Sequence, residues 1–170
     1  ELLKLQTNTT PLQQAQKHLL LSSMNYMLVY PDLALESAQL ALELIDESTQ
    51  PWLYHSIKLA ESLAYDISAT SNLGMDGAKK ALLWAQSHKH LDLEISALVT
   101  LGHLHTTSVQ YVTALKFLQK AYDMATLETK SQKGRIAGII AILYEERREN
   151  ELSIPYFEES ASYHKKKITS

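Results

Sequence analysis

Apolar residues recur along the chain three or four positions apart, and polar faces separate them. Between Pro11 and Glu47, for example, leucine and alanine fall at i, i+3, i+4 and i+7 in two successive stretches, which is the spacing of amphipathic helices. No stretch alternates between polar and apolar residues for long enough to predict a strand. The pattern therefore predicts an all-α chain of about eight helices, over about 11–29, 31–47, 51–69, 76–87, 92–107, 108–125, 131–147 and 153–167.

Several of these helices have recognisable start signals. Thr10 and Gln13 have the spacing of a capping box, and Thr129 and Gln132 repeat it. Because Pro155 is tolerated only in a first turn, we expect the last helix to begin late, near 153. The segment 71–74 and the segment 88–91 are predicted to be turns. The first three helices each begin at a proline, which costs no hydrogen bond there: Pro11, Pro31 and Pro51.

The same sequence interval separates small side chains in three of the four predicted helix pairs: Ser22 and Ala34, Gly102 and Ala114, Ala141 and Ser153. In the second pair, the second helix fits a similar frame of small and large residues at Ala78, Leu82 and Ala85. The register of the first helix of that pair stays open, and Leu63 and Ala64 are one option for it. Small residues let two helices approach closely, so a Gly102→Leu change should force them apart. The predicted packing residues are Ala34, Ala41, Ala78, Leu82, Leu101, Gly102, Ala114, Leu118, Ala141, Tyr144, Ser153 and Phe157.

Leu98, Leu101, Gly102 and His105 stand in the frame W-x2-L-G-x2-Y, with histidine, leucine or alanine in place of the tryptophan. The later A-x3-F position is filled by Ala114 and Leu118. In this the chain resembles the tetratricopeptide repeat (TPR) family, and in particular the longer, degenerate repeats of bacterial regulatory proteins. The resemblance implies a superhelical stack of about four antiparallel helix hairpins, over about 11–48, 51–88, 92–126 and 131–167. We expect residues 1–170 to form one such domain, cut from a larger protein.

The resemblance also implies where a ligand would bind, because the first helix of each pair lines a concave groove in this family. It implies a non-catalytic module that binds a protein or peptide, expected as the sensory or regulatory part of a bacterial signalling protein. A diguanylate cyclase, a kinase or a transcription activator would be a typical output domain, and that adjoining domain could itself be the partner. The candidate groove residues are Gln16, Leu19, Ser23, Tyr26, Met27, Tyr65, Ser96, Val99, His103, Thr106, Arg135, Ile142 and Glu145, with Lys58 and Glu61 in the open register of the second pair.

Two other functions remain open from the residues. One is a small-ligand sensor, with a pocket between hairpins that carries a few convergent polar groups. The other is a homodimer that forms through the terminal hairpin, because the last helix carries an apolar face without a polar cap repeat after it. That face consists of Ile154, Phe157, Ala161 and Tyr163.

Composition narrows the classes of function without naming a partner. The chain has 170 residues, 45% hydrophobic content and a net charge of −3, which suits a folded domain and disfavours a nucleic-acid groove. It contains no cysteine, so disulfides and thiol catalysis are excluded, and either the cytoplasm or the periplasm is a possible compartment. Its apolar runs are shorter than the ~20 residues of a membrane span.

The sequence offers little for catalysis or metal binding, and we expect no enzyme and no cofactor. Neither a phosphate-binding loop nor a hydrolase motif occurs. His88, His90 and Asp92 could form a surface zinc site, although a histidine at a helix terminus also has a structural explanation. The mixed charges over 145–151 should be solvated at a hairpin turn. The histidines without close partners are expected at surface or half-buried positions: His18, His55 and His164.

Overall fold

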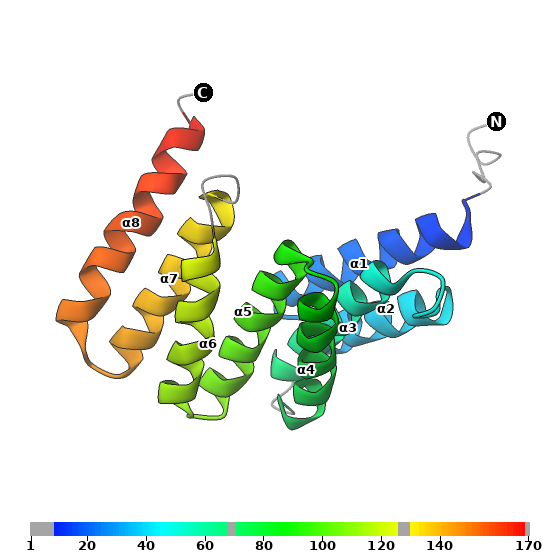
Figure 1. Cartoon of the computed structure of the whole chain (residues 1–170), viewed down its shortest axis with the longest axis horizontal. Coiled ribbons are helices and arrows are strands. Elements are labelled where there is room, and N and C mark those ends of the chain that lie inside the picture. Colours follow the sequence, from blue (N-terminus) through cyan, green and yellow to red (C-terminus); the bar gives the residue numbers. More distant parts are fainter. Residues whose placement is uncertain (1–8, 68–70, 126–129, 169–170) are drawn as a thin grey trace. The chain divides into compact units, whose positions relative to one another are not determined.

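The computed structural model describes residues 9–67, 71–125 and 130–168, and over these ranges the chain forms eight helices and no strand (Figure 1). Short loops connect them. The chain divides into two compact units, Glu1–Trp84 and Ala85–Ser170, and each is described by itself. The helices are α1 (Pro11–Met27), α2 (Pro31–Glu43), α3 (Pro51–Ile67), α4 (Ser71–Ser87), α5 (Leu91–Thr107), α6 (Tyr111–Met124), α7 (Lys130–Glu146) and α8 (Asn150–Ile168).

The helix pairs recur at intervals that are constant to within one position. The first helix of each pair begins at residue 11, 51, 91 or 130, and the second at residue 31, 71, 111 or 150. Alignment of the pairs on these starts defines a repeat register, which also fixes the second pair that the sequence had left open. In this register Gly74 is the counterpart of Ala34, Ala114 and Ser153, and the predicted frame at Ala78, Leu82 and Ala85 was four residues too late.

Small residues at these counterpart positions lie where the two helices of a hairpin cross. Ser22 Oγ donates a hydrogen bond of 2.8 Å to the carbonyl of Ala34, its partner in the predicted interval. In the second pair, a Cβ added to Gly74 would lie 2.7 Å from the carbonyl oxygen of Ser62, which precedes it by the same interval. The predicted packing residues are buried, except that Leu82 and Tyr144 are half-buried and Phe157 is 36% exposed.

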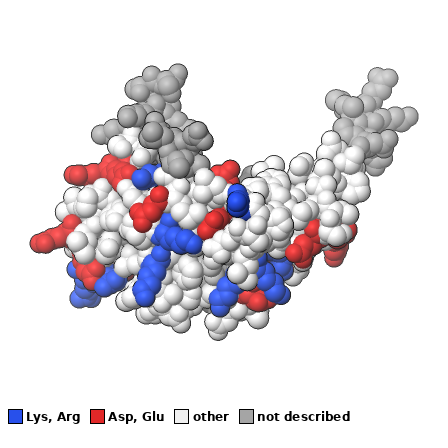
Figure 2. All heavy atoms as spheres, in the orientation of Figure 1, with Lys and Arg blue, Asp and Glu red and all other residues white. Residues whose placement is uncertain are grey.

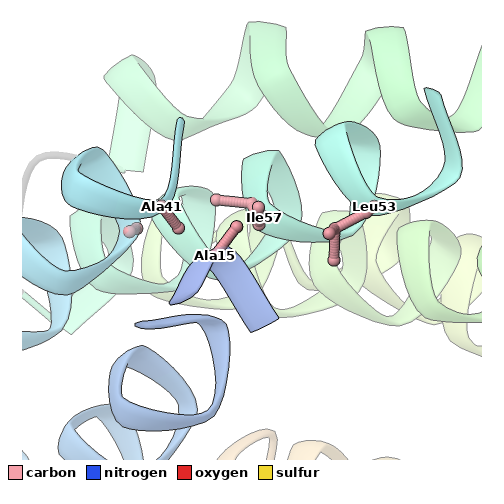
Figure 3. Packing of buried hydrophobic residues seen from close by; sticks show 5 residues of the cluster. Ala15, Ala41, Leu53 and Ile57 are labelled. Carbon is pink, nitrogen blue, oxygen red and sulfur yellow. The ribbon is translucent and has the colours of Figure 1, made fainter. Parts of the chain in front are cut away.

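The core of the first unit is built from small residues of α1 and α2 that meet larger ones of α3. Ala15, Ala38 and Ala41 cluster with Leu53 and Ile57, and all five side chains are buried (Figure 3). Since alanine projects so little from a helix, α1 and α2 can both reach α3, and both do. In the second unit α6 packs on α5, α7 on α6 and α8 on α7.

Two helices begin three or more residues earlier than predicted. Helix α4 starts at Ser71, so the expected turn over 71–74 is its first turn; Gly74 provides close approach to Ser62 and does not break the helix. Helix α8 starts at Asn150, and Pro155 lies inside it. Proline at this position removes one helical hydrogen bond, and because Pro155 is exposed, water can bond the carbonyl that loses its donor.

Helix α2 ends at Glu43, four residues before the predicted end. The Asp46 carboxylate accepts hydrogen bonds from the backbone N–H groups of Ser48 (2.9 Å) and Thr49 (3.0 Å), which closes a local turn in place of a further helical turn. At the other end of the pair, the predicted capping box of Thr10 and Gln13 is confirmed. The box predicted at Thr129 lies outside the described residues.

The start of α6 and the start of α5 also differ from the prediction. Ser108, expected in α6, caps α5 instead, and its hydroxyl donates to the Leu104 carbonyl (2.8 Å). Helix α5 begins at Leu91, one residue before Asp92. Four described loops contain a residue in the left-handed conformation that usually favours glycine, with φ of 54–60°: Val29, Lys89, Val109 and Arg148.

The two glycines of α4 should respond differently to an added methyl group. We expect Gly74→Ala to destabilise the chain by about 1–3 kcal/mol, because its Cβ meets the Ser62 backbone. At Gly77 the Cβ would lie 3.0 Å from Ser62 Oγ, a side-chain atom that has to give by only a few tenths of an ångström, and alanine gains about 1 kcal/mol of helix propensity. Gly77→Ala should therefore be neutral or mildly stabilising. Urea unfolding followed by circular dichroism measures both, and equal losses of stability would contradict the assigned crossing point.

Candidate functional site

A cleft of about 210 Å³ separates α5 and α7, the first helices of two consecutive pairs in the second unit. It brings together three of the predicted groove residues, His103, Thr106 and Ile142. Leu143 is buried in the cleft, whereas Ile142 is 51% exposed beside it. The other lining residues are Thr107, Ile139 and Glu146.

The cleft is largely apolar, with few polar groups available to a ligand. The Thr106 hydroxyl donates to the Gly102 carbonyl (2.9 Å), and the Thr107 hydroxyl donates to the Leu104 carbonyl (3.1 Å), so both donors are used within α5. The imidazole of His103 and the carboxylate of Glu146 are the titratable groups of the lining. Such a site can hold an apolar side chain and hydrogen-bond or attract a polar group beside it.

The remaining groove residues fall into two sets, one in each unit. On α1, Gln16, Ser23 and Met27 are exposed, Tyr26 is half-buried, and Leu19 packs against the core of the first unit. On α3, Tyr65 is half-buried. In the second unit, Arg135 and Glu145 are exposed and Ser96 is half-buried, whereas Val99 is only 3% exposed and lies among packed residues.

A second cavity, of about 540 Å³, lies between α3 and α4 in the first unit. Two candidate groove residues from the open register of the second pair, Lys58 and Glu61, line this cavity, but the sequence did not predict a cavity between these two helices. His55 corrects the expectation of a surface or half-buried histidine: it is 3% exposed, and its Nε2 lies 3.2 Å from Glu47 Oε1. The lining residues are Glu47, Tyr54, His55, Lys58, Glu61, Ser62, Leu73, Asp76, Gly77, Lys80, Leu83 and Trp84.

The possible zinc site at the α4–α5 turn is not formed. His90 instead caps α5, since its Nδ1 accepts the backbone N–H of Leu93 at 3.3 Å. His88 Nδ1 lies 2.9 Å from the Ser87 hydroxyl. Among the described residues, no group of three or more histidine, aspartate or glutamate side chains is placed to hold a metal ion. His18 is half-buried as expected, and the side chain of His164 lies outside the description.

Charged side chains of both signs lie close together on the visible face of the described residues (Figure 2). Figure 2 shows acidic and basic side chains interspersed on one face of the molecule. At the α7–α8 turn, Arg147 pairs with Glu149 at 2.7 Å, inside the mixed run over 145–151. None of the described helices is long and apolar enough to cross a membrane.

A cluster of tyrosines links the last three helices. The Tyr122 hydroxyl donates to the carboxylate of Glu159, and Lys133 Nζ lies 4.4 Å from the centre of the Tyr122 ring. The Tyr156 hydroxyl donates to Gln119 Oε1 at 3.1 Å. Burial raises the pKa of Tyr122 well above its ordinary value, and the hydrogen bond to Glu159 and the negative charge of that residue raise it further.

Comparison with known proteins supports the fold and does not name a family. No family model and no curated protein sequence matches the chain. Its structure is similar to the crystal structure of the apo form of RapI, a TPR-like helical repeat protein, with a TM-score of 0.74 and 13% sequence identity. The match covers 98% of this chain and 61% of RapI, so the chain spans about three fifths of that protein's length. The predicted all-α helical-repeat fold is thus confirmed.

The Tyr122–Glu159 contact should make the stability of the second unit fall at alkaline pH. Because the folded-state pKa of Tyr122 is raised, the native chain keeps a proton that the unfolded chain loses above pH ~10, and stability declines as the pH rises through that value. We expect Tyr122→Phe to cost about 1–2 kcal/mol at pH 7 and to flatten the decline between pH 9 and about 11.

Urea unfolding at several pH values measures this dependence. Tyr30→Phe is the matched control, because Tyr30 is exposed and lies at the α1–α2 turn. It should leave the stability at pH 7 and the alkaline decline unchanged. An equally steep alkaline decline in Tyr122→Phe would show that the hydrogen bond does not couple stability to pH.

Proposed function

We propose that the chain is a non-catalytic module that binds a peptide or a partner helix along the face of its first helices. The observation that carries this proposal is the α5–α7 cleft, which lies between the first helices of consecutive pairs and includes His103, Thr106 and Ile142. The likeness of the fold to RapI, a TPR-like repeat protein, supports a protein-binding role.

The chemistry of the cleft favours a segment with one apolar anchor and a basic neighbour. Ile139, Ile142 and Leu143 would surround an aliphatic or aromatic side chain, and burial of such a side chain contributes roughly 1.5–3 kcal/mol. Glu146 lines the same cleft and Glu145 is exposed next to it, so a lysine or arginine next to the anchor would meet two carboxylates.

The proposal includes a regulatory role in a bacterial signalling protein, with an output domain such as a diguanylate cyclase, a kinase or a transcription activator. The basis for this is the resemblance of the repeats to those of regulatory proteins. In such an arrangement the adjoining domain itself could supply the bound segment, and binding of a competing peptide would release it.

Dimerisation through the last helix is a second candidate, favoured by the exposure of its apolar face. Ile154 is 54% exposed and Phe157 is 36% exposed. In the repeat register, Phe157 is the counterpart of Leu118, which is fully buried. Leu118 lies against Gly102 of α5 and is fully covered, whereas Phe157 keeps an exposed part that a second copy of the chain could cover.

Peptide binding can be tested with a matched pair of isoleucines in the second unit. Peptides selected by phage display against the chain should be enriched in an apolar residue next to lysine or arginine. We expect Ile142→Glu to weaken binding of a selected peptide at least about tenfold, since it places a charge where the anchor sits. Ile154→Glu, at similar exposure on α8, should leave affinity within about twofold. Fluorescence anisotropy measures both, and equal effects would overturn the assignment of the cleft.

Dimerisation can be tested separately by sedimentation velocity at several concentrations. We expect the chain to show a concentration-dependent dimer that Phe157→Glu abolishes, because a buried unpaired carboxylate opposes the contact. Val112→Glu, an equally drastic change at an exposed position of α6, should leave the dimer intact. A wild-type chain that stays monomeric at every concentration would remove this second candidate.

A further inference from the structure

The second hairpin carries titratable side chains where the third carries apolar ones. In the repeat register, three polar residues of α3 correspond one by one to apolar residues of α5, and each of those α5 residues is at most 1% exposed. The α7 counterparts are buried as well and carry no charge. The three pairs are His55 and Ile95, Lys58 and Leu98, Glu61 and Leu101.

The second hairpin also lacks an aromatic ring that the third and fourth possess. Gly77 of α4 is the counterpart of Phe117 in α6 and Tyr156 in α8. Phe117 stacks on His105 with ring centres 5.3 Å apart, and Tyr156 stacks on Tyr144 at 5.9 Å. At Gly77 there is no ring, and the 540 Å³ cavity includes this residue in its lining.

Helix crossing does not explain the glycine at position 77. A Cβ at Gly74 would collide with the Ser62 backbone, so that glycine is needed for packing. A Cβ at Gly77 would meet no backbone closer than 3.6 Å; it would lie 3.0 Å from the Ser62 hydroxyl and in ordinary contact with Lys58 Cε at 3.6 Å. Close approach of the two helices therefore accounts for Gly74 but not for Gly77.

The polar groups around this space are held in place by one another. Lys58 Nζ forms an ion pair with Glu61, and these side chains are only 27% and 12% exposed. His55 lies 5.1 Å from the Trp84 ring, between that ring and Glu47. At the open side of the cavity, Lys80 pairs with Asp76 at 2.8 Å, and both are well exposed. Burying charged groups costs free energy that apolar residues of similar size would not, and departures of this kind concentrate at functional sites.

We propose that the α3–α4 cavity binds a small aromatic zwitterion, an aromatic amino acid either free or within a short peptide. Its ring would lie inside the cavity beside Tyr54 and Trp84. Its ammonium group would meet Glu61 or Glu47, and its carboxylate would meet Lys58. The volume lies within the ~300–1,000 Å³ that small-molecule sites typically have. The site lies in the first unit, so it goes beyond the peptide cleft of the second.

Calorimetric titration of the whole chain tests the ligand class. We expect L-phenylalanine, L-tyrosine or L-tryptophan to bind and to raise the melting temperature. L-Alanine, which lacks the ring, and N-acetyl-phenylalaninamide, which lacks both charges, should bind at least about tenfold more weakly. The dipeptide Ala-Phe distinguishes a peptide source from a free amino acid, and tighter binding of either supports the site. If none of these aromatic ligands binds, or if the uncharged amide binds as well as phenylalanine, the proposal is wrong.

Variants test the location of the site. Gly77→Phe supplies the missing ring and should reduce binding at least about tenfold. The double change Lys58→Leu and Glu61→Leu gives α3 the leucines that α5 has at the corresponding positions, and it should also abolish binding. This second variant keeps the test decisive if Gly77→Phe misfolds. Phe117→Gly opens the matching space in α6 without the three polar residues, and it should leave binding in the first unit unchanged. Undiminished binding in both cavity variants would overturn the assignment. Ile142→Glu should not affect this binding, which separates the outcome from that of the peptide cleft.

Discussion

The close crossing of two helices within each hairpin is the contact on which the rest of the structure depends. In the first pair, the buried hydroxyl of Ser22 donates to the carbonyl of Ala34. In the second pair, the backbone of Ser62 approaches Gly74 so closely that no side chain would fit there. Because the helix starts recur at a nearly constant interval in every pair, these two contacts fix a register that can be carried to the other pairs. Which side chains face a core and which line a cleft follows from that register.

Much of the fold could be predicted from the sequence, because it depends on spacing. The helices and the constant interval between small residues are local patterns, and they are present in the structure with shifts at the helix ends. The second register was missed because Gly74 has two possible roles: a glycine can end a helix or permit a close approach, and only the position of Ser62 distinguishes them. Pro155 led to the wrong start for α8 for a similar reason. A proline inside a helix is tolerated where it is exposed, and its exposure depends on how α8 packs.

The site could be predicted only in part. His103 and Thr106 share a face of α5 because residues three or four apart lie on the same side of a helix. Ile142 lies at the corresponding region of α7, and the three residues line one cleft. Val99 belongs to the same predicted set but is buried. The helical period alone does not distinguish the face of α5 that lines the cleft from the neighbouring face that packs in the core. The α3–α4 cavity contains Lys58 and Glu61, which the sequence offered as candidates, but the cavity itself depends on how α3 and α4 pack, which spacing alone does not give.

Among the described residues of each unit, the main helix contacts are made with the next helix or the next but one in the chain. Chains with such local contacts order quickly, since little loop entropy is lost before each contact forms. They can also come apart piece by piece, because each layer is held by its neighbours alone. In the second unit α6 packs on both α5 and α7, whereas α8 packs on α7, so a protease acting on these residues should cut within α8 before it cuts within α6.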